Sequence, residues 1–259
     1  MGAELLFWPA LFAYGEASLA FAREARRPGV AGRLAIWGVR LGWLAQTGLL
    51  LLQAVRAEGF PWGGWAGALN LFAWLVVGAY LIWGCRPSFR LLGLAVMPIA
   101  AALLLVAYAG GGIREAGGRT DALLALHVAL MLAGFAGFTL AAALSTLYLW
   151  HERRLKRREA TIFRLRVPAL QVLDRLGART VAVSLLVLTL GIALGGVSLA
   201  LDGGRFDAAM GGALAVWLGY GGFLLLRRRT ALHGRRSARA SLVVFVAVVV
   251  VIPLTHFAS

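Results

Sequence analysis

The chain has 259 residues, of which 61% are hydrophobic and only 14% are charged, and its formal net charge is +15 at pH 7. A soluble globular domain has about a quarter charged residues, so this composition excludes that class and indicates a membrane protein. The basic residues lie in short clusters between apolar runs, which favours topology signals and lipid contacts over nucleic-acid binding. The single cysteine, Cys85, excludes an intrachain disulfide and a cysteine-only metal site.

Eight apolar runs are each near or above the length of about 20 residues that a transmembrane helix needs. We therefore predict an all-α polytopic membrane protein, folded as a single transmembrane domain over residues 1–259 with short connections. The predicted spans are Glu4–Phe21, Leu34–Val55, Gly64–Gly84, Leu91–Ala109, Ala122–Trp150, Val181–Leu201, Ala208–Leu226 and Ala240–Phe257.

The distribution of Lys and Arg predicts the orientation of these spans. Alternate connections, at 23–33, 86–90, 153–179 and 227–239, together hold 21 of the 26 basic residues, whereas the remaining connections hold four. Because cytoplasmic loops carry the excess of Lys and Arg, the first set is assigned to the cytoplasm. With eight helices, both termini then lie outside.

One charge lies within each of the first two predicted spans. Glu16 and Arg40 fall at about the same depth in consecutive antiparallel helices. An ion pair is the least costly arrangement for two charges inside a membrane, so we predict that they pair; a proton path is the alternative.

The cytoplasmic segment that follows Arg158 alternates apolar and charged residues. Pro168 can open a short helix, because proline suits the first helical position. We predict an amphipathic helix over Pro168–Leu176 that lies on the inner membrane face.

Four histidines divide between the two sides of the membrane. His127 lies about two turns inside the outer face, where a histidine is costly unless something uses it, and His256 ends the last predicted span on the same side. Two neutral imidazoles on facing helices can hold haem iron from both faces, whereas two histidines alone make a poor zinc site. An ordinary membrane-interface position is the alternative for each. His151 and His233 fall on the inner side, where we expect solvated interfacial residues.

The helical face of His127 also carries Met131, Gly134, Phe135 and Phe138. Such a face usually packs on another helix, but it also suits a porphyrin, because Gly134 permits close approach and aromatic rings can stack. The outer half of the sixth span offers the same two interpretations, close helix packing or room for a flat ligand. Its glycines are Gly191, Gly195 and Gly196.

Haem propionates need cationic partners at the water edge, and guanidinium groups suit carboxylates. The candidates on the outer side are Arg56, Arg114, Arg119 and Arg205.

Five ordered segments of the second half match the motifs of a known family. They are Leu126-His127-Val128 through Leu147-Tyr148-Leu149-Trp150-His151-Glu152; Pro168-Ala169-Leu170 with Leu173-Asp174; Leu188-Thr189-Leu190-Gly191 with Gly195-Gly196; Trp217-Leu218-Gly219-Tyr220 with Gly234-Arg235-Arg236-Ser237-Ala238; and His256. In these segments the chain resembles the cytochrome c assembly protein family of membrane haem handlers, the CcsA, CcmC and HemX group. The resemblance implies haem b as cofactor and the paired external histidines at His127 and His256. Contacts from Met131 and Phe135 are expected from their place on the helical face of His127.

One departure from the family bears on function. Its cytochrome c synthases carry a tryptophan-rich external segment, whereas the connection Asp202–Asp207 is short and has no tryptophan. This favours a HemX-like branch. The resemblance implies a non-enzymatic protein of the bacterial inner membrane that transports, delivers or senses haem, with a cytochrome-maturation protein or a soluble haem-biosynthesis enzyme as partner. The alternative is a cofactor-free regulator that docks such an enzyme through Arg153–Arg179.

Overall fold

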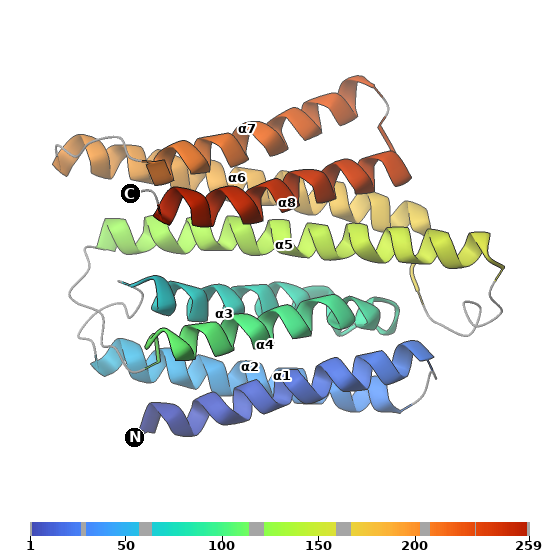
Figure 1. Cartoon of the computed structure of the whole chain (residues 1–259), viewed down its shortest axis with the longest axis horizontal. Helices are drawn as coiled ribbons and strands as arrows, with labels where there is room; N and C mark the ends of the chain where they lie inside the picture. Colours follow the sequence, from blue (N-terminus) through green and yellow to red (C-terminus); the bar gives the residue numbers. More distant parts are fainter. Residues whose placement is uncertain are drawn as a thin grey trace. The chain divides into compact units, whose positions relative to one another are not determined.

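The computed structural model describes residues 2–26, 30–56, 64–113, 122–158, 167–202, 208–230 and 232–257, with side chains for all of these except residues 2, 3, 202 and 251–257. This part of the chain is helical, as predicted (Figure 1). The helices are α1 Gly2–Arg26, α2 Ala31–Arg56, α3 Trp65–Gly84, the 3-10 helix η1 Pro87–Leu92, α4 Gly93–Ala109, α5 Ala122–Lys156, α6 Leu170–Asp202, α7 Ala208–Arg229 and α8 Arg235–Phe257.

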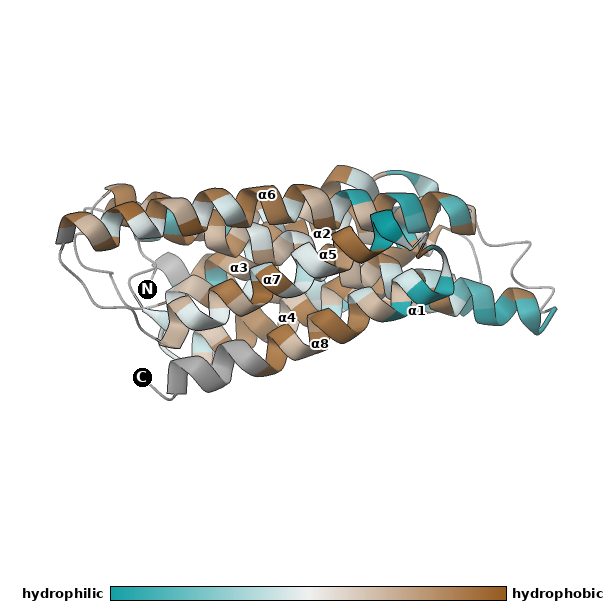
Figure 2. Cartoon of the chain, turned by 90° about the horizontal axis from the view of Figure 1, so that it is seen from above, coloured by the Kyte–Doolittle hydropathy of each residue, from teal (hydrophilic) through white to brown (hydrophobic). Residues whose placement is uncertain are grey.

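The lengths and compositions of the helices support a protein that crosses the membrane several times. Within the described residues, seven segments are long and apolar enough to span it, one each from α1 to α7. Helix α8 coincides with the eighth predicted span and has 23 residues. Figure 2 shows hydrophobic residues along the middle of the helices and hydrophilic residues gathered towards ends such as the last turns of α5. The placement of the termini outside stays a prediction.

Helices α5 and α6 extend beyond the predicted spans. Helix α5 continues past Trp150 to Lys156, and α6 begins at Leu170 and runs unbroken to Asp202. The predicted amphipathic helix is therefore wrong as a separate element, because its residues form the first turns of α6. Leu173 is only 1% exposed, so the apolar side of these turns packs on protein.

Contacts between Cα atoms divide the chain into two compact units. Unit 1 consists of residues 1–121 and 158–168 and holds α1 to α4 with η1, while unit 2 consists of residues 122–157 and 169–259 and holds α5 to α8. Each unit has its own buried core, so each is considered by itself. The prediction of a single transmembrane domain stays a prediction.

Helices α1 and α2 of unit 1 pack antiparallel in a defined register. The Gly32 amide donates to Glu24 Oε2 at 3.2 Å, and a Cβ added at Gly42 would lie 3.0 Å from the Tyr14 ring. In both pairs the residue numbers add up to 56. The numbers of Glu16 and Arg40 do so too, which confirms that these two residues lie at one depth.

The predicted ion pair between Glu16 and Arg40 is nevertheless wrong. Glu16 is exposed, whereas Arg40 Nη2 donates to Cys85 Sγ at 3.3 Å and its Cζ lies 4.8 Å from the centroid of the Trp37 ring. Equal depth fixes the position of a residue along its helix but not the direction in which its side chain points. Helix α1 buries Ala17, at 2% exposure, and this turns the neighbouring Glu16 outward.

A buried chain of hydrogen bonds joins the helices of unit 1. Tyr14 Oη donates to Gln46 Oε1 at 2.7 Å, and Gln46 Nε2 donates to Asn70 Oδ1 at 2.9 Å. Asn70 Nδ2 then donates to Gln53 Oε1 at 3.0 Å, and Gln53 Nε2 donates to the Gly112 carbonyl at 2.7 Å. Polar side chains between membrane helices bond to one another because lipid offers no partner.

We expect Asn70→Ala to lower the free energy of unfolding by about 1–3 kcal/mol. The substitution leaves the buried Gln53 Oε1 without the Asn70 donor and removes one of the two bonds that Gln46 Nε2 makes to Asn70. Denaturant unfolding of the detergent-solubilised protein measures this loss. The matched control is Ser18→Ala, which removes only a bond to the Tyr14 carbonyl in the same helix. Equal losses in the two variants would show that the interhelical chain contributes nothing.

Unit 2 is built around the close packing of α5 on α6. Gly134 and Gly137 of α5 meet α6 at Leu188 and Ser184, so neither position has room for a side chain. Deeper in the unit, the rings of Phe138 and Tyr220 stack with centroids 3.8 Å apart and planes 6° from parallel. These contacts confirm the helix-packing interpretation of Gly134 and Phe138 on α5.

Candidate functional site

The His127 imidazole makes a polar contact with α6. Its Nδ1 lies 2.7 Å from the Gly191 carbonyl oxygen, and the side chain is half-buried. A carbonyl oxygen can only accept, so Nδ1 must carry the hydrogen. In the neutral ring, Nε2 then keeps its lone pair for another partner, as in histidines that bind a metal.

Two glycines of α6 make the space that His127 and Met131 occupy. A Cβ added at Gly195 would lie 2.5 Å from His127 Cε1 and 2.8 Å from Nδ1. One added at Gly191 would lie 3.0 Å from Sδ of Met131, one turn further along α5. We call this the glycine notch. The next glycine, Gly196, faces open space, with no atom within 4 Å of an added Cβ.

The rest of the predicted haem-facing surface of α5 packs against protein. Met131 lies on the Gly191 backbone, and Gly134 lies against α6. Phe135 is partly buried against the core of unit 2, and Phe138 is fully buried within it. The interpretation that Gly134 and Phe138 face a porphyrin is therefore wrong. Gly134 lets helix α6 approach closely, and the ring that stacks on Phe138 is that of Tyr220.

The second predicted ligand, His256, is placed only by its backbone. It lies in the last turn of α8. The last turn of α8 and the first turn of α5 lie at the same end of unit 2 (Figure 1). The His256 side chain lies outside the described residues, as do the whole of Arg114, Arg119 and Arg205. Among the described residues, no group of three or more His, Cys, Asp or Glu could hold a metal ion.

The two remaining histidines differ from each other. His233 is exposed, as predicted for a solvated residue. His151 is only 8% exposed, so the prediction is wrong for this side chain.

A second polar cluster lies at the opposite end of unit 2 from His127. Arg227 of α7 makes a bidentate ion pair with Asp174 of α6, with Nη1–Oδ1 at 2.9 Å and Nη2–Oδ2 at 2.8 Å. Their side chains are only 12% and 11% exposed. Arg227 also donates to the Ser237 hydroxyl and the Leu232 carbonyl, and the Gly234 amide donates to Asp174 Oδ1. We call this network the inner clasp.

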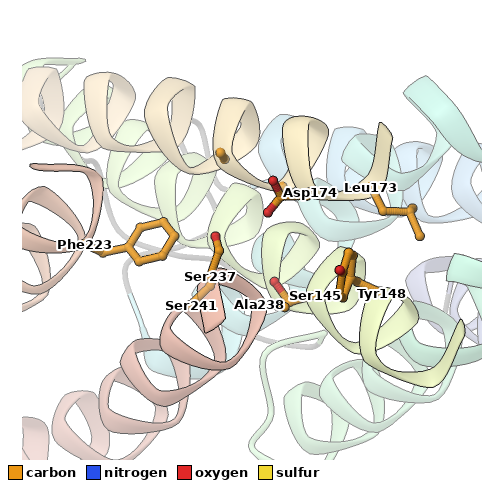
Figure 3. A pocket seen from close by; sticks show the side chains of 10 residues that line it. Ser145, Tyr148, Leu173, Asp174, Phe223, Ser237, Ala238 and Ser241 are labelled. Atoms are coloured by element: carbon orange, nitrogen blue, oxygen red, sulfur yellow. The ribbon is translucent and has the colours of Figure 1, made fainter. Parts of the chain in front are cut away.

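The inner clasp borders a small cavity. Figure 3 shows Asp174 beside Ser145 and Tyr148 of α5 and Ser237 and Ser241 of α8. The cavity measures about 10 Å³, which is close to the smallest space that holds one water molecule. The sequence reasoning missed the contact between Asp174 and Arg227. The available signal was that Asp174 and Gly234 both lie in segments that carry the family resemblance.

Comparison with known proteins settles the family. The family model described as "Cytochrome C assembly protein" matches residues 62–258, which is more than half of the chain. The chain belongs to the cytochrome c assembly family. The match includes α3 to α8, with both His127 and His256, whereas α1 and α2 precede it. A search among curated proteins finds no match.

Family membership and the apolar helices together define the coarse function. The chain is a multi-pass membrane protein of a haem-handling family, associated with cytochrome c biogenesis. Both the glycine notch and the inner clasp lie within the residues that the family model matches.

Proposed function

We propose that this protein of the bacterial inner membrane binds one haem b near the outer leaflet, with His127 and His256 as axial ligands. In that role it carries, delivers or senses haem and is not an enzyme. The observation that carries the proposal is the hydrogen bond from His127 Nδ1 to the Gly191 carbonyl. It orients the imidazole and presents Nε2 as a ligand, which is what a backbone carbonyl does behind a metal-binding histidine.

The residues present fit haem on chemical grounds. Imidazole nitrogen is a good ligand for iron, and the His127 ring is only half-buried. When bound, haem supplies a redox-active iron that the two histidines would keep six-coordinate. Met131 and Phe135 would line the inner edge of this site. The propionates would meet Arg114, Arg119 and Arg205.

The short connection after α6 favours the HemX-like branch of the family. It has no tryptophan, so the aromatic segment with which the cytochrome c synthases present haem is missing. We therefore place the protein in haem carriage or sensing, in contact with a cytochrome-maturation protein or a soluble haem-biosynthesis enzyme.

The absorption spectrum tests the proposal. We expect protein purified from haem-replete membranes to show a low-spin Soret band, and its pyridine haemochrome to identify haem b. Because each histidine supplies one axial ligand, His127→Ala and His256→Ala should each remove the low-spin band. His233→Ala, which changes an exposed histidine at the other end of unit 2, should leave it intact. A spectrum that is unchanged in both ligand variants would overturn the proposal.

A further inference from the structure

The outward face of α1 carries an exposed stripe with one charge in its middle. Leu5, Phe12 and Leu19 are 73%, 64% and 62% exposed, and Pro9 and Glu16 continue the same stripe. Their spacing alternates between four and three residues, which is the pattern of a helix that packs along another helix. A Cβ added at the adjacent Gly15 would meet no atom within 4 Å, so a neighbouring helix can approach closely there.

The Glu16 carboxylate is in a costly position. Glu16 lies eight residues before Glu24, which is about 12 Å along the axis of α1. Glu24 itself accepts a hydrogen bond from the Gly32 amide, near the start of α2. Glu16 makes no hydrogen bond or ion pair within the described residues. A glutamate is too short to reach the membrane surface from this depth, and a carboxylate that faces lipid costs several kcal/mol or more.

Arg40 is the complementary group at the same depth. It lies eight residues after Gly32, so the register of α1 and α2 sets it level with Glu16. Among the described residues, its guanidinium contacts the Cys85 thiol and the face of Trp37, which is itself 60% exposed. Neither contact neutralises the positive charge. Within the described residues, Glu16 and Arg40 are the only Asp, Glu, Lys or Arg in the middle of a predicted span.

We propose that the exposed face of α1 and α2 is the interface of a homodimer, in which Glu16 of each copy pairs with the partner's Arg40. Two copies that share one orientation in a membrane are related by a two-fold axis along the membrane normal. Such an axis keeps every residue at its own depth, so Glu16 of one copy meets Arg40 of the other at the same level. The interface is isologous, and both ion pairs form together.

The remainder of this face suits a second membrane helix. Besides the α1 stripe, α2 exposes Leu34, Trp37, Leu41 and Leu44, each by at least 58%. Both helices precede the region that matches the family model. The dimer is thus a property of the helices that this chain adds, and it does not depend on haem binding.

Exchange of the two charges tests whether the pair joins two copies. Full-length Glu16→Arg and Arg40→Glu variants, with donor and acceptor dyes at their termini, are reconstituted separately and as a mixture in liposomes. Each variant alone places like charges at both contacts, so energy transfer should fall and the association constant should drop on the order of tenfold. The mixture places opposite charges at both contacts, so energy transfer should return to the wild-type level.

Three outcomes would overturn the proposal: wild-type protein that is monomeric in liposomes, a mixture no better than the single variants, or cross-links from position 16 to unit 2 of the same chain. Arg23→Gln, at the end of the same stripe, is the control and should not change energy transfer. Thermal unfolding establishes that each variant is folded. If a charge reversal prevents folding, Glu16→Gln and Arg40→Gln replace it, and each should weaken the dimer.

Discussion

Replacement of Gly195 by alanine is expected to weaken haem binding by about 10- to 100-fold, although Gly195 is not itself a ligand. The added methyl group would lie 2.5 Å from Cε1 of the His127 imidazole, far inside the distance of 3.5–4.0 Å at which two carbon atoms attract. The ring must therefore move away from α6. Because Nδ1 bonds to Gly191 at 2.7 Å, this movement stretches or breaks the bond that orients Nε2.

The adjacent glycine supplies a matched control. Gly196 has no atom within 4 Å of an added Cβ, so Gly196→Ala should leave haem affinity unchanged and raise helix stability slightly. Titration of the purified apoprotein with haem, followed at the Soret band, gives both affinities. If Gly195→Ala binds haem as tightly as Gly196→Ala does, the glycine notch does not position the ligand, even where His127→Ala abolishes the band.

Positions along the helices were predictable from the sequence, because apolar length and periodicity follow directly from the chemistry of a bilayer. Apolar length and periodicity predict the eight apolar runs and the equal depth of Glu16 and Arg40. They also predict small residues at the contact between α5 and α6. The long α5 helix was also predictable. The continuation of α6 back to Leu170 was hidden, because a charged helix end is indistinguishable in composition from a loop.

The direction in which a side chain faces was much less predictable. Glu16 and Arg40 are level but do not pair, because the close contact at Gly42 fixes how α1 and α2 are rotated. Similarly, the α5 face below His127 could pack on a ligand or on a helix. Only the position of α6 shows that Gly134 meets Leu188. The direction in which a side chain faces depends on how several helices pack together, and the periodicity of one helix does not determine it.

The inner clasp was hidden because its two charged residues, Asp174 and Arg227, are 53 residues apart in sequence. In the sequence, each of these residues looks like part of a basic connection that sets the membrane topology. Asp174, however, is one of few carboxylates among many arginines, and the fold places it within reach of both Nη atoms of Arg227. A rare carboxylate in a basic segment is therefore a signal for a structural ion pair.

We expect Asp174→Ala to lower the free energy of unfolding by about 3–5 kcal/mol. The substitution leaves the Arg227 guanidinium, only 12% exposed, without its counter-charge, and an uncompensated charge in a buried position is strongly destabilising. It also removes the acceptor of the Gly234 amide, which opens α8 with a left-handed backbone at φ 66°. The start of α8 should thus loosen together with the contact between α6 and α7.

Removal of both charges should be less harmful than removal of one. In Asp174→Leu combined with Arg227→Met, no buried charge remains, so we expect most of the lost free energy to return. Glu152→Ala is the matched control near the same end of unit 2, since it breaks pairs with Lys156 and Arg235, whose side chains are 63% and 45% exposed. Pairs with such exposed partners contribute about 0–1 kcal/mol. Denaturant unfolding in detergent ranks the three variants, and a single Asp174→Ala loss no greater than that of Glu152→Ala would show that the clasp is not a stabilising contact.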